Sequence, residues 1–197
     1  TCCGALAAHA GYASDAEDMA MRNIDAMGDA DVIVADVAGC GAHLRTYQRH
    51  GEAGRLVASK VVDVNDLVAR AIEDGRLPVF ESHGSLVGVQ DPCHLEHGLR
   101  SHTAVDVVVT AAGFVPVPID RGGLCCGAAG SYQLEHPEMA SELGRRKAAA
   151  VSASGVSLVA SANAGCEMQL RRFVGGGVGV VHPIELYAEA LDRSGRG

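Results

Sequence analysis

The sequence predicts an α/β fold of two similar repeats, each a small, mainly parallel sheet flanked by helices, related by a pseudo-two-fold duplication. Short β-branched runs alternate with stretches of helical pattern, which is typical of βαβ units. Cysteine clusters recur with the same neighbouring residues. A chain of 197 residues that is 48% hydrophobic is long enough for one large or two small cores. We expect an N-terminally truncated first repeat over 1–75 and a second over 86–197.

Five apolar runs are the expected strands, and six stretches are the expected helices. The strands are expected at 32–34, 86–89, 115–117, 158–160 and 178–181. The helices are expected over 15–27, 41–49, 64–74, 103–112 and 137–153 and after Pro183, which suits a first helical turn. Segment 75–85, broken by Pro78 and Gly84, is the expected boundary between the repeats.

The cysteines repeat together with their neighbours. Cys2-Cys3-Gly4-Ala5 matches Cys125-Cys126-Gly127-Ala128, and Ala38-Gly39-Cys40 matches Ala164-Gly165-Cys166. Cys40, Cys93 and Cys166 are expected in loops at the carboxyl ends of strands, where open α/β sheets bind ligands. The paired cysteines are expected in glycine-rich turns whose backbone N–H groups point at sulfur. All seven cysteines are therefore candidate metal ligands, although the first repeat shows no counterpart of Cys93.

Thiolates suit either zinc or an iron-sulfur cluster, and four of them complete either centre. Cys93, Cys125, Cys126 and Cys166 supply that number in the second repeat. Their long spacings differ from those of ferredoxins and zinc fingers, so the fold itself must assemble the site. Buried structural thiols are the alternative for any single cysteine. Disulfide chemistry between the neighbours Cys125 and Cys126 is disfavoured, because the ring would be strained.

Two further residues are candidates for binding the cofactor. Gly127 would let the backbone approach sulfur closely, which a branched side chain would prevent. Asp91 would accept hydrogen bonds and orient the Cys93 loop, or would simply form an Asp-Pro turn. His43 is either a fourth ligand of the first repeat or a helix-surface residue, and His94 and His97 flank Cys93. No catalytic triad or phosphate loop is convincing, so no catalytic residue is expected in this chain.

Charge and hydropathy exclude several classes of protein. A net charge of -8 argues against a nucleic-acid partner, and the basic run Arg145-Arg146-Lys147 is expected to be a solvated helix face. No apolar run reaches the roughly 18 residues of a transmembrane helix. Seven cysteines without a signal peptide indicate a reducing compartment. We therefore expect a cytoplasmic protein, at most peripheral on the inner face of the membrane.

Three segments resemble the paired cysteine-rich (CCG) domains of iron-sulfur oxidoreductase subunits: Asp91-Pro92-Cys93-His94, Leu124–Tyr132 and Asn163-Ala164-Gly165-Cys166. Within that family they are most similar to the carboxy-terminal half of glycolate oxidase iron-sulfur subunits. The resemblance implies an iron-sulfur electron-transfer role, most simply with a 4Fe-4S cluster. It also implies flavin-containing dehydrogenase subunits that oxidise a 2-hydroxy acid such as glycolate, an N-terminal ferredoxin-like half, and a membrane electron acceptor reached indirectly.

The chain departs from the family pattern at two positions. The family ends each repeat in Cys-x-x-Cys, whereas His43 and Gln169 stand at the last positions here. A five-thiolate cluster is therefore not expected, whereas a cubane or a zinc ion remains open for the second repeat. The alternative function is a zinc-stabilised module that docks a partner subunit and has no redox activity.

Overall fold

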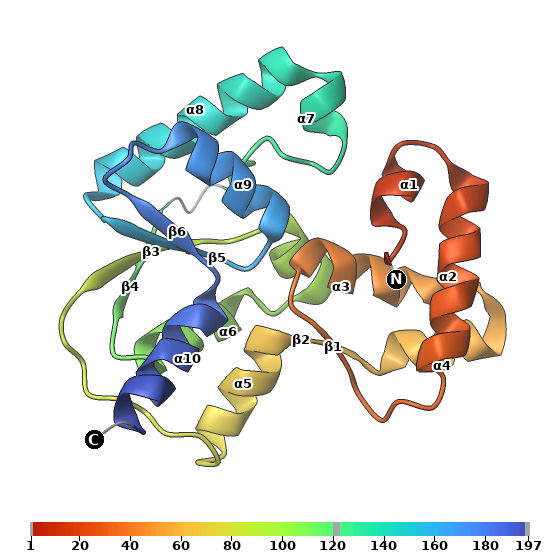
Figure 1. Ribbon diagram of the computed structural model, residues 1–197, viewed down its shortest axis with the longest axis horizontal. Helices are drawn as coiled ribbons and strands as arrows, with labels where there is room; N and C mark the ends of the chain where they lie inside the picture. Colours follow the sequence, from red (N-terminus) through yellow and green to blue (C-terminus); the bar gives the residue numbers. More distant parts are fainter. Residues whose placement is uncertain (1, 120–122, 196–197) are drawn as a thin grey trace.

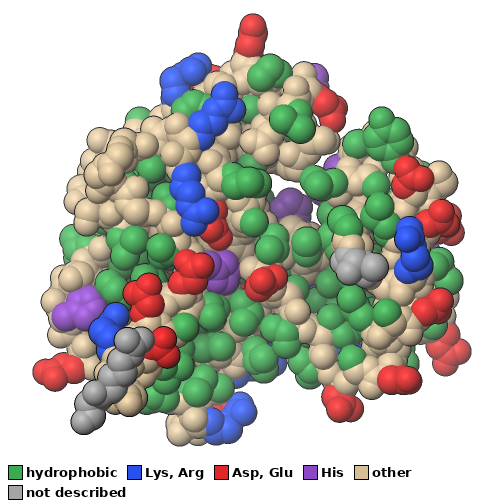
Figure 2. All heavy atoms as spheres, viewed as in Figure 1, with side chains coloured by type: hydrophobic (Ala, Val, Ile, Leu, Met, Phe, Trp, Pro, Cys, Tyr) green, Lys and Arg blue, Asp and Glu red, His purple; other side chains and the backbone are tan. Residues whose placement is uncertain are grey.

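The protein is described by a computed structural model that covers residues 2–119 and 123–195. Two lobes face each other across a recess, as Figures 1 and 2 show. The small lobe (2–63) contains α1 (Ala5–His9), α2 (Ala13–Met27), β1 (Ile33–Ala35), α3 (Ala38–Arg45), the 3-10 helix η1 (Thr46–Arg49), α4 (Gly51–Ser59) and β2 (Val61–Asp63). Its two strands form a parallel sheet in which Ile33 pairs with Val61.

The large lobe holds the remaining elements around a four-stranded parallel sheet of order β4-β3-β5-β6. These elements are α5 (Val64–Glu73), β3 (Leu86–Gln90), the π-helix η2 (His94–Leu99), α6 (His102–Ala111), β4 (Val115–Pro118), α7 (Tyr132–Glu135), α8 (Pro137–Ser154), β5 (Leu158–Ser161), α9 (Ala164–Phe173), β6 (Gly179–Val181) and α10 (Pro183–Ser194). β4 lies at an edge, which explains why its two prolines are tolerated.

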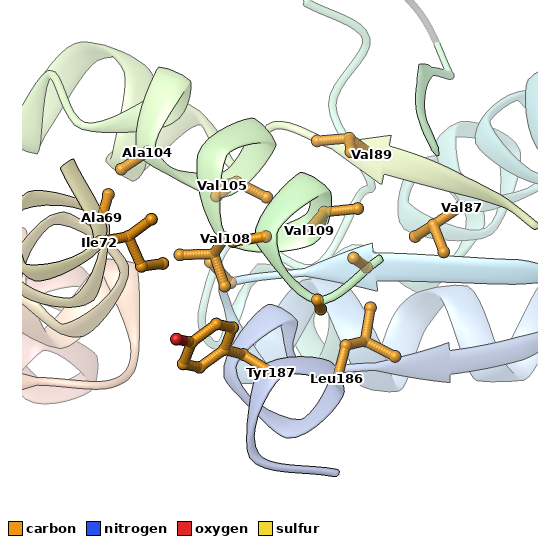
Figure 3. Packing of buried hydrophobic residues seen from close by; sticks show 14 of the residues in the cluster. Ala69, Ile72, Val87, Val89, Ala104, Val105, Val108, Val109, Leu186 and Tyr187 are labelled. Atoms are coloured by element: carbon orange, nitrogen blue, oxygen red, sulfur yellow. The ribbon is translucent and has the colours of Figure 1, made fainter. Parts of the chain in front are cut away.

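Helices cover both faces of this sheet, because β3 carries buried residues that face both sides. Val87 and Val89 of β3 pack against α6 and α10, whereas Gly88 between them faces Val156 and Ile119. In Figure 3, Val105 and Val108 of α6 lie among residues of α5 and α10. The other face is closed by α8 and α9, whose Val151 and Leu170 pack with Val159 and Val180.

The largest core joins the two predicted repeats. Ala69 and Ile72 of α5, which precede the expected boundary, belong to the same buried cluster as α6 and α10. The small lobe has its own core, centred on the fully buried Tyr47 and Val57. Segment 75–85 carries neither helix nor strand. The division into 1–75 and 86–197 stays a prediction.

The mixed α/β class with small parallel sheets between helices is confirmed. The two-fold duplication is not confirmed, because one sheet has two strands and the other has four. Six of these elements were missed: α1, α7 and η2 are short, β2 has only two apolar residues, α4 contains two glycines, and α9 is largely polar. The helix expected over 41–49 begins at Ala38 instead and continues into η1.

Within residues 2–119 and 123–195, no helix combines the length and the hydrophobicity needed to cross a bilayer.

Candidate metal centre

The first thiol cluster consists of Cys2, Cys3 and Cys40 and lies where α1 and α3 begin. The thiols of Cys3 and Cys40 share a hydrogen bond, with their sulfur atoms 3.2 Å apart. Gly4, at φ +85°, turns its N–H toward the sulfur of Cys2 at 3.4 Å. The backbone of this turn is fixed from behind, because the Tyr47 hydroxyl donates to the Cys3 carbonyl at 2.7 Å. An adjacent cysteine pair and a distant cysteine are thus brought together by the fold.

The second thiol cluster consists of Cys93, Cys125, Cys126 and Cys166 and repeats this local arrangement. The sulfur atoms of Cys126 and Cys166 are 2.9 Å apart, and the thiol of Cys125 lies close enough to those of Cys126 and Cys93 to interact with both. Gly127, at φ +86°, donates its N–H to the sulfur of Cys125 at 3.4 Å. The four thiols therefore form a continuous chain of contacts, from Cys93 at the surface to the buried Cys166.

Cys40 and Cys166 do not lie in loops as expected. Each lies in the first turn of a helix, α3 or α9, that begins directly after a strand. Cys93 is the residue before η2, three residues after the end of β3. These three cysteines therefore follow the carboxyl ends of parallel strands as expected, but the connecting segments are shorter than expected because helices begin within a few residues of the strands. That the cysteines bind a metal stays a prediction.

Hydrogen bonding within each cluster separates the thiols into acidic and weakly acidic groups. The hydrogen bond with Cys40 lowers the pKa of Cys3 to about 6, and the same contact raises the pKa of Cys40. In the second cluster, hydrogen bonds with Cys126 and then with Cys93 lower the pKa of Cys125, whereas the pKa values of Cys93 and Cys126 are raised. A hydrogen bond with Cys126 also lowers the pKa of Cys166. Cys3 in the first cluster, and Cys125 and Cys166 in the second, are therefore the more readily formed thiolates, and a bound cation would favour loss of the remaining protons.

The cysteine thiols are suitable ligands for a metal centre, but their sulfur atoms do not surround a common point at metal-binding distances. Thiolates on a tetrahedral zinc ion lie about 3.8 Å apart, from Zn–S bonds of about 2.3 Å. The pairs at 2.9 Å and 3.2 Å are closer than that. Among the residues described, no three His, Cys, Asp or Glu side chains are arranged to hold one metal ion. Binding would require small rotations of the cysteine side chains away from one another.

The glycine of the second turn is required by its surroundings. A Cβ atom on Gly127 would lie 2.5 Å from the carbonyl oxygen of Ala140 and 3.0 Å from the Cβ of Leu143, both in α8. The backbone also has a positive φ, which L side chains rarely adopt. Gly127 therefore lets the cysteine turn pack directly against α8.

The role expected for Asp91 stays a prediction. Its carboxyl is half-buried, and burial, followed by the nearby Asp106, raises its pKa. The loop after Cys93 is held by backbone bonds instead, since the N–H groups of Leu95 and Glu96 both donate to the Pro92 carbonyl.

Histidines from both lobes meet between the two clusters. The ring of His9 stacks on that of His94, with centroids 6.2 Å apart, and lies edge-on to that of His43 at 6.3 Å. Burial, followed by the neighbouring His9, lowers the pKa values of His43 and His94. His97 instead points outward beside Glu96. Sequence reasoning missed His9, whose place in this group depends on the closure of the two lobes.

Lys147 corrects the expectation of a wholly solvated basic face. Arg145 and Arg146 are exposed and pair with Glu142, as expected of a helix surface. Lys147 is only 2% exposed, and its Nζ donates to the Leu124 carbonyl at 3.0 Å. Its positive charge also helps to lower the pKa of Cys125, after the hydrogen bonds with Cys126 and Cys93. This lysine therefore holds the backbone next to Cys125 and stabilises the Cys125 thiolate.

An α/β protein with two cysteine clusters of the same local geometry forms a recognisable class. The family model described as cysteine-rich domain (CCG) matches residues 1–45 and 87–171, which are more than half of the chain. The chain therefore belongs to the CCG cysteine-rich domain family. The matched segments contain all seven cysteines.

Three relatives illustrate its similarity to known proteins. The glycolate oxidase iron-sulfur subunit of Escherichia coli (strain K12) is 29% identical over 98% of this chain and 49% of that protein. One of the subunits of the fumarate reductase (CoM/CoB) of Methanothermobacter marburgensis is 29% identical over 86% of this chain and 34% of that protein. The lactate utilization protein A of Shouchella clausii is 24% identical over 86% of this chain and 73% of that protein. The chain thus spans about half the length, or less, of the first two relatives.

Proposed function

We propose that this chain is an iron-sulfur electron-transfer part of an oxidoreductase complex, and that its cysteine clusters hold the redox centres. The observation that carries this proposal is the chain of contacts through Cys93, Cys125, Cys126 and Cys166. An iron-sulfur cluster supplies reversible one-electron transfer when bound to such thiolates. Similarity to the iron-sulfur part of a glycolate oxidase and to part of a fumarate reductase supports the same class of function.

The residues around the second cluster have complementary roles in this proposal. Cys93, Cys125, Cys126 and Cys166 are the proposed ligands, most simply of a 4Fe-4S cluster. The Gly127 N–H and the Lys147 ammonium offset negative charge on sulfur, which favours the thiolate state needed for binding. The Ala128 and Cys166 side chains are buried and keep water from the inner sulfurs. Cys93 remains exposed, so electrons would enter or leave on its side.

The small lobe offers only three thiols, Cys2, Cys3 and Cys40. A fourth ligand of this cluster would come from His43, from a partner, or from solvent.

We propose that the complex oxidises a 2-hydroxy acid on a flavin subunit. Glycolate is the first substrate to test, because two similar proteins are glycolate oxidase iron-sulfur subunits. We also propose a ferredoxin-like segment as the second partner, and a membrane acceptor reached from the cytoplasmic side.

The test is metal content and colour of the chain purified without oxygen. We expect iron and sulfide together with absorption near roughly 400 nm from thiolate-iron bonds. Cys126→Ser should remove the iron of the second cluster and leave that of the first, whereas Cys3→Ser should do the reverse. Met168→Ala is the matched control, because Met168 lies on α9 near Cys166 but is exposed. A colourless chain that takes up no iron on reconstitution would contradict the proposal.

The alternative is a zinc-stabilised docking module, and the sulfur spacing favours it as the second candidate. The sulfur pairs, at 3.2 Å and 2.9 Å, would have to separate less to reach the spacing of about 3.8 Å on one zinc ion than to bind the separate iron atoms of a cluster. In this case zinc would contribute folding free energy on the order of 10 kcal/mol at neutral pH. Stoichiometric zinc without any redox response would establish this alternative.

A further inference from the structure

The first helix turn of α3, which carries Cys40, is not capped by its own sequence. Its N-cap residue is Val37, which has no side-chain acceptor for the free N–H groups of the first turn. Such groups require partners when they lie between packed elements. The N–H groups of Ala38 and Gly39 both face the large lobe, toward the turn between β5 and α9.

That turn supplies both acceptors. The Ala38 N–H donates to the Ala162 carbonyl at 3.1 Å, and the Gly39 N–H donates to Oδ1 of Asn163 at 3.0 Å. Asn163 is itself the N-cap residue of α9, yet its side chain makes no capping bond to its own helix. An asparagine in this position would ordinarily cap the helix it precedes. Here it caps a helix of the opposite lobe instead.

The other end of the same amide serves the second thiol cluster. Nδ2 of Asn163 donates to the sulfur of Cys166 at 3.4 Å. A hydrogen bond with Cys126 lowers the pKa of Cys166, and the bond from Asn163 adds to this effect. A single side chain therefore contacts the residue next to Cys40 with its oxygen and Cys166 with its nitrogen.

The local sequence repeat makes this asymmetry visible. When Ala38-Gly39-Cys40 is aligned with Ala164-Gly165-Cys166, Val37 stands opposite Asn163. Of these two aligned N-cap positions, only the one in the second repeat carries a polar side chain. The absence of a side chain at Gly39 leaves room for this contact, because a Cβ atom there would lie only 3.2 Å from Oδ1 of Asn163.

We propose that Asn163 is a positioning residue for both thiol clusters, which caps the helix that carries Cys40 while it orients the sulfur of Cys166. Order at the first cluster then depends on a residue of the second. This inference deepens the proposed function, because Cys40 and Cys166 are proposed ligands. It concerns the free thiols, however, so it can be tested whether the chain binds iron, zinc or neither.

The experiment measures the alkylation rate of each cysteine in the reduced, metal-free chain with iodoacetamide and peptide mass spectrometry. In Asn163→Ala, we expect Cys40 to react about fivefold faster than in the wild type, which is the population change expected when one helix cap is lost. Asn163→Asp keeps an oxygen acceptor for the Gly39 N–H and loses the donor to Cys166. Cys40 should therefore react at the wild-type rate in Asn163→Asp, while the rate at Cys166 changes. Met168→Ala is the control on α9.

Two results would overturn the proposal. Faster labelling of Cys166 with an unchanged rate at Cys40 in Asn163→Ala would show that Asn163 serves its own repeat alone. An equal rise at all seven cysteines would show general unfolding rather than positioning. Hydrogen exchange of the wild-type peptide spanning 37–41 provides a test if Asn163→Ala does not fold. Protection of the Gly39 amide is expected, and an unprotected amide would refute the capping contact.

Discussion

Alanine substitutions at three glycines with left-handed backbones test how closely the cysteine turns pack against neighbouring helices. Two of these glycines lie in the cysteine turns, and the third lies at the end of α8. Gly127, Gly4 and Gly155 have φ values of +86°, +85° and +71°. Alanine at any of them costs roughly 1–2 kcal/mol for the backbone alone. The surroundings differ, because the added Cβ would lie 2.5 Å from the Ala140 oxygen at Gly127 and 3.3 Å from the Ala16 oxygen at Gly4. At Gly155 nothing lies within 4 Å.

The expected order of destabilisation is therefore Gly127→Ala, then Gly4→Ala, then Gly155→Ala. Forcing α8 away from the Gly127 turn adds roughly 1–3 kcal/mol, as overpacking of a close contact does. Gly127→Ala should thus lose roughly 2–5 kcal/mol of unfolding free energy, and Gly155→Ala only roughly 1–2 kcal/mol.

Denaturant unfolding of the reduced, metal-free variants, followed by circular dichroism, measures these differences. Equal losses at Gly127 and Gly155 would show that backbone conformation alone decides the cost, and would refute the close approach of the turn to α8. Metal uptake measured on the same three variants should fall most in Gly127→Ala, because that change moves Cys126 as well.

Two further predictions concern buried charges. Lys147→Met removes the donor to the Leu124 carbonyl and should cost roughly 1.5–3 kcal/mol of unfolding free energy, whereas Arg146→Met on the exposed side of α8 should cost under about 0.5 kcal/mol. Similar losses in both would contradict the inward orientation of Lys147. Burial raises the pKa of Asp63, whose Oδ1 accepts from the Asn65 N–H at 2.9 Å. A raised folded-state pKa means that its contribution to stability is present at low pH and is lost as pH rises through that pKa. The stability of the wild type relative to Asp63→Asn should therefore fall as pH rises above the ordinary pKa of an aspartate, about 4, and a difference that does not change with pH would refute this reasoning.

The alternation of strands and helices was readable from the sequence because each long strand is an apolar run bordered by polar turns. Val87 and Val89 illustrate this, since both are buried and belong to the expected strand 86–89. β2 was not readable, because it has only two apolar residues and is followed directly by α5, so that no turn separates the strand from the helical pattern. The local cysteine turns were predicted from Gly4 and Gly127, whose repeated position required a special backbone.

The parts of the site that depend on long-range packing were not predictable. Lys147 follows two arginines on α8, and only the helical rotation turns its side chain inward. Asn163 was noted as part of a motif, but its oxygen contacts Gly39, 124 residues earlier in the chain. Sequence spacing carries no information about such a contact until the two lobes are placed together.

The membership of α5 in the largest core has a practical consequence for anyone who divides this protein. Cutting the chain between 75 and 86 would separate Ala69 and Ile72 from α6, so that part of the valine-lined surface of α6 would become exposed to water. A separately expressed C-terminal piece would then be prone to self-association through that surface. Dissection of the two thiol clusters is therefore better done by single cysteine substitutions in the intact chain than by cutting it in two.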